Sequence, residues 1–273
     1  MSASGQPAAP TAFRHLRLLT YNIQVGIPTR RYRDYLTHGW KHLLPSPERM
    51  GNLDRIAALI ADYDIIGLQE TDAGSLRSHF LNQTEYLALR AGLPYWNHQT
   101  NRRLGHLGQH SLGLIARQPP RELDCVPLPS RVRGRGAMVA RFGGSDDEVL
   151  VIVTHLALGS RTRLQQMDFL ARLVGHHPRA VVMADFNCTP HSPEMRHLIA
   201  HTGLRLADGT APSYPSWKPA RPIDHILVTP ALSVREARVL PVPYSDHLPV
   251  AVEVCLPERC LPHTDHTDRE TAP

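Results

Sequence analysis

The sequence predicts an α/β protein in which two mixed β-sheets pack face to face and helices lie outside them. Along the 273 residues, short apolar runs rich in Val, Ile and Leu outnumber the helical patterns. Near-continuous runs of this kind are typical of strands buried on both faces. The runs at 111–117, 137–142 and 149–154 are separated by turns rather than helices, which favours mixed sheets over purely parallel ones.

Eight runs are expected to form strands. In chain order they span residues 16–23, 64–68, 111–117, 137–142, 149–154, 180–184, 223–229 and 248–254.

Three segments between these runs have helical periodicity. One apolar face is shared by Leu53, Ile56, Ala57 and Ile60, and another by Leu164, Met167, Leu170, Ala171 and Val174. A third helix is expected to begin at Ser192-Pro193-Glu194, where a capping residue precedes a proline in the first turn, and to end at Gly203.

A single domain is expected over residues 14–260, with a disordered leader at 1–13 and a disordered tail at 261–273. The leader has no apolar core, so it does not read as a secretory signal. No run approaches the roughly 18 apolar residues that a membrane span requires. None of the four cysteines forms a CxxC pair, and free thiols in the cytoplasm are expected.

The chain is basic, with a formal net charge of +5 from 30 Lys and Arg against 25 Asp and Glu. Basic clusters occur at 30–33, 102–103 and 131–135. This balance suits an anionic substrate such as a lipid head group, a phosphorylated small molecule or a nucleic acid. A solvated basic surface would look the same, so charge alone leaves both interpretations open.

Polar residues stand at the ends of most of the apolar runs. They are Asn22, Glu70, His155, Asp185, Asn187, Asp224, Asp246 and His247. If the strand ends converge, four carboxylates meet two imidazoles and two amides. Crowded carboxylates repel each other strongly, and a bound cation relieves that cost. Oxygen ligands favour Mg²⁺, with Mn²⁺ as a substitute, over Zn²⁺.

The motifs that carry these residues resemble those of the endonuclease/exonuclease/phosphatase superfamily. They are Thr20-Tyr21-Asn22, Leu68-Gln69-Glu70, Thr154-His155-Leu156, Ala184-Asp185-Phe186-Asn187, Ile223-Asp224-His225 and Ser245-Asp246-His247. Each motif alone is weak, but the six occur in the family's order over residues 20–247. The resemblance implies the DNase I-like fold, a four-layer sandwich of two mixed sheets with helices outside.

The same resemblance implies a division of roles. Glu70 and Asp246 are expected to hold the metal, with Asn22 beside them. Asp185 is expected to orient and deprotonate the attacking water, and Asn187 to donate to a phosphate oxygen.

The histidines complete the implied site. His247 is expected to donate to the phosphate and Asp224 to orient its ring. His155 matches the histidine of the DNase I, sphingomyelinase and inositol-phosphatase branches, which argues against the abasic-site repair branch.

Several of these residues also have a plain structural interpretation. Asp185 and Asn187 could form an Asx turn, and His155 alone could be a satisfied, partly buried histidine. His225 follows Asp224, so in a strand it faces the other way and is expected to be structural. Cys188 is expected to pack as a small apolar residue.

Arg133 and Arg135 are candidate substrate-binding residues. Gly134 and Gly136 beside them would let the backbone approach a phosphate closely. A simple basic turn explains the pattern equally well.

The function expected from these features is metal-dependent hydrolysis of phosphate monoesters or diesters. A small-molecule or lipid head-group substrate is favoured over nucleic acid, because 6% aromatic residues offer little stacking surface. The segment 32–44 contains Tyr, Trp and Leu side chains that could form an apolar rim for peripheral membrane contact. A nuclease of the same fold is the alternative. An inactive binding module is disfavoured, because every family position holds a competent residue. The sequence leaves the oligomeric state open.

Overall fold

The structure is a computed structural model and describes residues 15–27, 47–78, 80–104, 108–130, 134–144, 147–207 and 211–256. The expected leader at 1–13, the expected tail at 261–273, the segment 32–44 and Arg133 lie outside the described residues.

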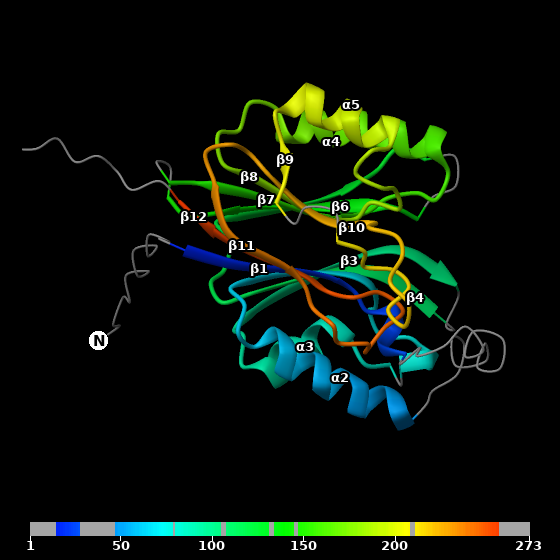
Figure 1. The fold of residues 1–273 in the computed structure, drawn as a ribbon. Coiled ribbons are helices and arrows are strands. Elements are labelled where there is room, and N and C mark those ends of the chain that lie inside the picture. The colour runs from blue at the N-terminus through cyan, green and yellow to red at the C-terminus, as the bar shows by residue number, and fades with distance from the viewer. Residues whose placement is uncertain are drawn as a thin grey trace, which may run out of the picture.

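Two six-stranded mixed sheets form the centre of the fold (Figure 1). The first has the order β11-β12-β1-β2-β4-β3 and the second the order β5-β6-β7-β8-β10-β9. The strands of the first are β1 (His15–Asn22), β2 (Ile65–Asp72), β3 (Tyr95–Leu104), β4 (Gly108–Ala116), β11 (Ser233–Val239) and β12 (Val250–Cys255). Those of the second are β5 (Glu122–Pro127), β6 (Gly136–Phe142), β7 (Val149–His155), β8 (Ala180–Asp185), β9 (Arg205–Leu206) and β10 (Asp224–Val228).

Helices cover the outer face of each sheet, which gives the four layers (Figure 1). The α-helices are α2 (Pro47–Ile60), α3 (Gln83–Ala91), α4 (Ser160–Val174) and α5 (Pro193–Thr202), and two 3-10 turns, η1 (Gln24–Gly26) and η3 (Leu76–Ser78), follow β1 and β2. Helices α2 and α3 lie on the first sheet, and α4 and α5 lie on the second. The predicted fold class is confirmed. Among the described residues, no helix combines the length and apolarity needed to cross a bilayer.

Three apolar clusters correspond to the three contacts between layers. One lies between the sheets and includes Leu18, Met138 and Val151. The others lie under the helix pairs, with Ile56 in the α2–α3 cluster and Met167 in the α4–α5 cluster. Both faces of each sheet are therefore buried, which explains the near-continuous apolar runs in the sequence.

Each sheet contains one parallel pair of strands at its centre. In the first sheet β1 and β2 are parallel and joined through α2. In the second sheet β7 and β8 are parallel and joined through α4. Because parallel strands end at the same edge, Asn22 lies opposite Gln69, and His155 lies opposite Asp185. This topology places the predicted site residues at one end of the sandwich.

Strands β3, β5, β9 and β11 and helix α3 were not predicted from the sequence. Strands β5 and β11 lie at sheet edges and alternate between exposed and half-buried side chains, so they have no continuous apolar run. Helix α3 has only 9 residues, and its limits come from the Asn82 cap and left-handed Gly92. The predicted start of α5 is confirmed, because Ser192 Oγ accepts a hydrogen bond from the Met195 N–H at 3.2 Å.

Candidate active site

Strand ends from both sheets bring the predicted residues together. Asn22, His155 and Asp185 are the last residues of β1, β7 and β8, and Glu70 lies near the end of β2. Asp224 begins β10 directly opposite Asp185 in the antiparallel register. The Asp246-His247 pair precedes β12, which runs antiparallel to β1 and so begins where β1 ends.

The carboxylate of Asp185 lies at the centre of the cluster. Its Oδ2 atom accepts a hydrogen bond from Asn22 Nδ2 at 3.1 Å and lies 3.3 Å from His155 Nε2. His247 Nε2 lies 3.8 Å from the same oxygen. The other oxygen, Oδ1, accepts from the backbone N–H of Asn187 at 3.0 Å. A carboxylate held from several sides is positioned to take a proton.

The surroundings of Asp185 shift its acidity toward neutral pH. Burial and the negative charge of Asp224 raise the pKa of the Asp185 carboxyl to about 7. His247 and the hydrogen bonds from Asn22 and the Asn187 N–H oppose that rise. A general base is most effective when its pKa lies near the working pH.

A second carboxylate orients the ring of His247. His247 Nδ1 lies 2.8 Å from Asp224 Oδ2, and that oxygen also accepts a 2.6 Å hydrogen bond from the Ser213 hydroxyl. Ser213 Oγ in turn accepts from the backbone N–H of Asp224 at 3.2 Å. Asp224 and His247 are thus in contact, which leaves Nε2 as the ring nitrogen that faces Asp185.

The two site histidines carry different charges. Burial acts to lower the pKa of His247, but Asp224 and Asp185 outweigh it and raise that pKa well above the ordinary value. Burial lowers the pKa of His155 well below its ordinary value, and Arg135 and His247 act in the same direction. The charged form of His247 and the neutral form of His155 are therefore favoured, so the 3.3 Å contact of His155 Nε2 with Asp185 Oδ2 is not an ion pair.

Glu70 occupies a left-handed position inside β2, with φ of 54°. The register between β2 and β4 shifts between Leu68 and Thr71, which marks a β-bulge. Left-handed backbone is uncommon for a glutamate, and residues in such conformations concentrate at functional sites. Because of the bulge, the Glu70 side chain does not follow the alternation of side-chain directions along the strand.

Asn187 reaches the site by a route that the sequence analysis did not foresee. The expectation relied on strand alternation, but β8 ends at Asp185 and Asn187 is left-handed, with φ of 53°. Its N–H closes an Asx turn onto Asp185 Oδ1, while its Nδ2 donates to the Leu156 carbonyl at 2.9 Å. The catalytic and turn interpretations of this segment therefore describe the same residues.

His225 and Cys188, which follow the site residues Asp224 and Asn187 in the sequence, behave as predicted. His225 is fully buried, its Nε2 lies 3.1 Å from the Pro222 carbonyl oxygen, and its ring contacts Phe186 at 5.9 Å between centroids. Cys188 is buried in the cluster beneath α4 and α5. Both are structural residues behind the site.

The chemistry around Glu70 fits a hard divalent cation. Burial raises the pKa of the Glu70 carboxyl, and the charge of Asp246 adds to that rise. A cation shared by the two carboxylates would remove their repulsion. The Asn22 amide donates to Asp185 and acts to lower the pKa of Glu70, and its Oδ1 accepts from the Gln24 N–H at 3.1 Å. Carboxylate and amide oxygens are donors that Mg²⁺ prefers.

A second acidic group is less suited to a metal. Ligand-type atoms of Asp185, Asp224 and His247 lie within 4.8 Å of one another. His247 Nδ1 lies 2.8 Å from Asp224 Oδ2, and its Nε2 lies 3.8 Å from Asp185 Oδ2. Both ring nitrogens therefore face carboxylates, so the oxygen-rich Glu70 side is the better cation site.

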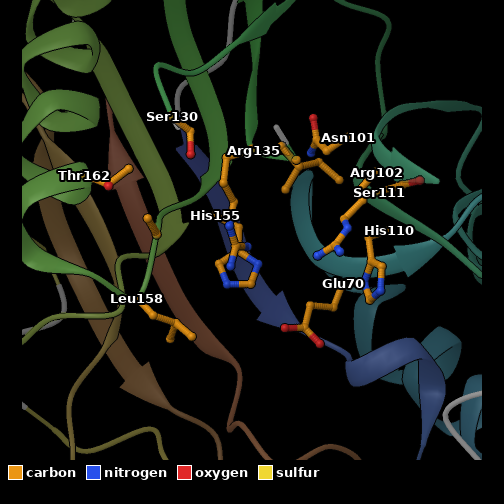
Figure 2. A pocket seen from close by; sticks show the side chains of 13 residues that line it. Glu70, Asn101, Arg102, His110, Ser111, Ser130, Arg135, His155, Leu158 and Thr162 are labelled. Carbon is orange, nitrogen blue, oxygen red and sulfur yellow. The ribbon is translucent and has the colours of Figure 1, made fainter. Parts of the chain in front are cut away.

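A cavity of about 520 Å³ opens beside Glu70 (Figure 2). His155 and Arg135 lie centrally in the view, with His110 and Arg102 on the side of Glu70. Burial lowers the pKa of Arg135, while the charges of Glu70 and Asp185 oppose that shift. The guanidinium therefore lies close to both carboxylates.

The structure adds residues that the sequence analysis missed. The cavity is also lined by Asn101, Arg102, His110, Ser111, Ser130 and Thr162. Burial and the charge of Arg77 lower the pKa of His110 to about 4, so this ring is neutral. None of these residues follows an apolar run in a family-like motif, and only the Arg102-Arg103 pair gave a sequence signal.

The loop around Asp246 is held by serines. Ser245 Oγ donates to Asp246 Oδ1 at 3.0 Å, and Ser216 Oγ donates to the Ser245 carbonyl at 2.6 Å. The backbone N–H of Ser216 also donates to the Asp246 carbonyl at 2.7 Å. Ser245 could have been inferred from its place before Asp246, whereas Ser216 has no such signal.

A model of the endonuclease/exonuclease/phosphatase family matches residues 19–247. The chain therefore belongs to the endonuclease/exonuclease/phosphatase family. Members of this family are typically hydrolases of phosphoester bonds that depend on a divalent metal. Comparison with curated protein sequences gave no match.

Several solved structures share the fold. An endonuclease/exonuclease/phosphatase from Beutenbergia cavernae superimposes with a TM-score of 0.71 at 22% identity, covering 89% of this chain and 72% of the other. The human Nocturnin catalytic domain with bound sulfate gives 0.68 at 19% identity, covering 89% and 96%. Mannosyl-6-phosphatase Bt3783 from Bacteroides thetaiotaomicron gives 0.64 at 19% identity, covering 88% and 100%. Identities this low establish the fold alone.

Proposed function

We propose that this protein is a metal-dependent hydrolase of phosphate esters. The observation that carries the proposal is the convergence on the Asp185 carboxylate of Asn22, His155 and the His247–Asp224 pair, with Glu70 alongside. Family membership supports the reaction class.

Asp185 acts as the general base in this proposal. It orients a water for in-line attack on phosphorus and takes its proton. Cationic His247 donates from Nε2 to the phosphate, and Asp224 keeps that ring oriented. Asn187, Arg135 and neutral His155 bind the phosphate oxygens. Arg133 stays a prediction for the same task.

Glu70 and Asp246 are the proposed ligands of Mg²⁺ or Mn²⁺, with Asn22 beside them. When bound, the cation polarises the phosphoryl oxygen and stabilises charge on the leaving oxygen. The mutual repulsion of the two carboxylates supports this assignment.

The test is a substrate panel assayed with Mg²⁺ and with chelator. It contains plasmid DNA, RNA, sphingomyelin, phosphoinositides and bis-p-nitrophenyl phosphate. Hydrolysis of at least one phosphoester, lost with chelator and restored by Mg²⁺, is the expected result. No hydrolysis together with no stoichiometric Mg²⁺ or Mn²⁺ binding would favour an inactive binding module instead.

A further inference from the structure

A second compartment adjoins the active-site cavity. This neighbour has a volume of about 660 Å³ and is lined by Gln99, Leu128, Pro129, Phe169 and Arg172, among others. The two hollows share four wall residues, which are Asn101, Ser130, Gly134 and Arg135. The two hollows therefore adjoin across these residues, and together they are called the groove.

The groove is strongly biased toward anions. Arg102 and Arg135 line the first compartment, and Arg135 and Arg172 line the second. Of the described residues that line either compartment, Glu70 is the single carboxylate. Beyond the proposed metal ligand, the groove therefore offers positive charge with no acidic group to repel a second phosphate.

Helix α4 contributes residues to both compartments, so its rise per residue gives the distance between them. Thr162 lines the first compartment, and Phe169 and Arg172 line the second. Seven residues of α-helix separate Thr162 from Phe169, which is about 10 Å along the axis. A ligand in both compartments must therefore extend over roughly that length.

The second compartment has the character of a ring-binding site. Phe169 is half-buried, and the Arg172 guanidinium lies 5.4 Å from the centroid of its ring. Pro127, Leu128 and Pro129 form an apolar wall. Flat aromatic and guanidinium surfaces stack on nucleobases with little dependence on their sequence.

Hydrogen bonds hold part of this wall in place. Gln166 is fully buried, and its Nε2 donates to the Pro129 carbonyl at 3.2 Å while its Oε1 accepts from the Ala157 N–H at 2.8 Å. Gln99 Nε2 donates to the Val126 carbonyl at 3.0 Å. The compartment therefore needs little ordering to bind a ring.

We propose that the Phe169–Arg172 compartment is a second subsite that binds a planar ring of the nucleobase type, linked to the scissile phosphate by an anionic backbone that crosses Arg135. This inference rests on the proposed function and narrows its substrate class to single-stranded oligonucleotides. It reverses the preference for a lipid or small-molecule substrate that the low aromatic content suggested.

The test compares two tetramers with the same backbone. One is tetrathymidylate, and the other carries tetrahydrofuran in place of every base. Binding is measured by calorimetry with Asp185→Asn protein in Ca²⁺, so that cleavage does not interfere. We expect the tetramer with bases to bind about tenfold more tightly, which matches one stacked base at the low end of its usual worth.

Variants on α4 locate the effect. Phe169→Leu keeps apolar volume against the core, and Arg172→Gln removes the guanidinium. Each variant should abolish most of the base preference. Phe169→Leu should leave binding of the base-free tetramer within about twofold. Arg172→Gln should also weaken that binding, because it removes a positive charge near the phosphate backbone. Arg161→Gln, an exposed arginine on α4 that lines neither compartment, is the matched control and should retain the preference.

Three outcomes would overturn the subsite. They are equal binding of both tetramers, a base preference that survives Phe169→Leu, or binding of sphingomyelin vesicles that depends on Phe169. Failure of the proposed function gives a different result, because it leaves wild-type protein without Mg²⁺-dependent hydrolysis whatever the tetramers show. A thermal melt of each variant confirms that the fold is intact.

Discussion

Nδ1 of His247 lies 2.8 Å from Oδ2 of Asp224, and the two side chains are almost completely buried. This pair links β10 to the turn before β12 and so connects the two sheets at the active-site end. Because Asp224 is the carboxylate in direct contact with Nδ1, it is the main reason that His247 is cationic.

Replacing Asp224 tests this relationship. Asp224→Asn removes the negative charge and can present an N–H to Nδ1, so His247 should become neutral. We expect kcat to fall by about 10²-fold or more, within the range that general acid–base groups contribute. The pKa of His247, followed by NMR, should fall with it. A variant with normal turnover and an unchanged His247 pKa would contradict the pairing.

Asp185→Asn should collapse turnover while the fold is retained. The amide cannot accept the proton of the attacking water, and it cannot keep Oδ2 anionic opposite His247. Asp168→Asn is the matched control, because this half-exposed carboxylate on α4 contacts His197 away from the site. Steady-state kinetics on the best substrate of the panel measure the effect, and near-normal rates in Asp185→Asn would remove the base assignment.

The metal-free protein should become less stable as pH rises above about 6.5. The pKa values of Asp185, Glu70 and His247 are all raised in the folded state, so these groups hold protons that the unfolded chain releases. The lowered pKa values of His155 and His110 act in the opposite direction, but only below the ordinary histidine pKa of about 6.5. Each carboxyl with a raised pKa contributes stability that begins to decline as pH rises above its pKa in the unfolded chain. The contribution of His247 is lost as pH rises through its pKa in the folded protein.

Thermal melts in chelator from pH 5 to pH 8 check this expectation. Above about pH 6.5, where His155 and His110 no longer make an opposing contribution, the melting temperature should fall by about 2–4 °C for each kcal/mol lost. Added Mg²⁺ should restore more of it at pH 8 than at pH 5, because the carboxylates must be ionised to bind the cation. Stability that rises toward pH 8 in chelator would be inconsistent with these shifts.

Glu70→Gln should weaken metal binding more than it weakens folding. The amide retains the size of the side chain in the β-bulge but removes one of the two charges that a cation would neutralise. We expect Mn²⁺ affinity to fall by at least about tenfold, because replacing a metal ligand or a residue that hydrogen-bonds to a ligand commonly weakens binding by that much. Titration calorimetry measures it, with the exposed Glu236→Gln as control. Unchanged affinity would place the cation elsewhere.

Gln166→Leu should loosen the wall between the cavity and α4. The substitution removes both the hydrogen bond to the Pro129 carbonyl and the one from the Ala157 N–H, and it leaves these backbone groups without their partner. Leaving buried polar groups unsatisfied costs about 1–3 kcal/mol each. Urea unfolding should show a loss in that range, and KM should rise more than kcat falls. No change in stability would mean that water replaces the side chain.

The order of apolar runs and the residues at their ends were enough to predict the fold class and the site. Glu70, His155, Asp185 and Asp224 each lie at or near one end of a strand that is buried on both faces. Such strands have a strong local signal, because their apolar composition depends on burial rather than on partners. The edge strands β5 and β11 lack that signal, so these segments form strands because they pair with a neighbouring strand.

Only the tertiary structure determined how these residues face one another. The sequence places Asn187 two residues after Asp185, but the left-handed backbone of Asn187 turns its amide to Leu156. Likewise, Ser213 and Arg102 come from segments with no catalytic pattern, and they reach the site or its cavity through long-range pairing. Local composition determines which segments are buried, whereas directions and distances between side chains depend on how the two sheets pack.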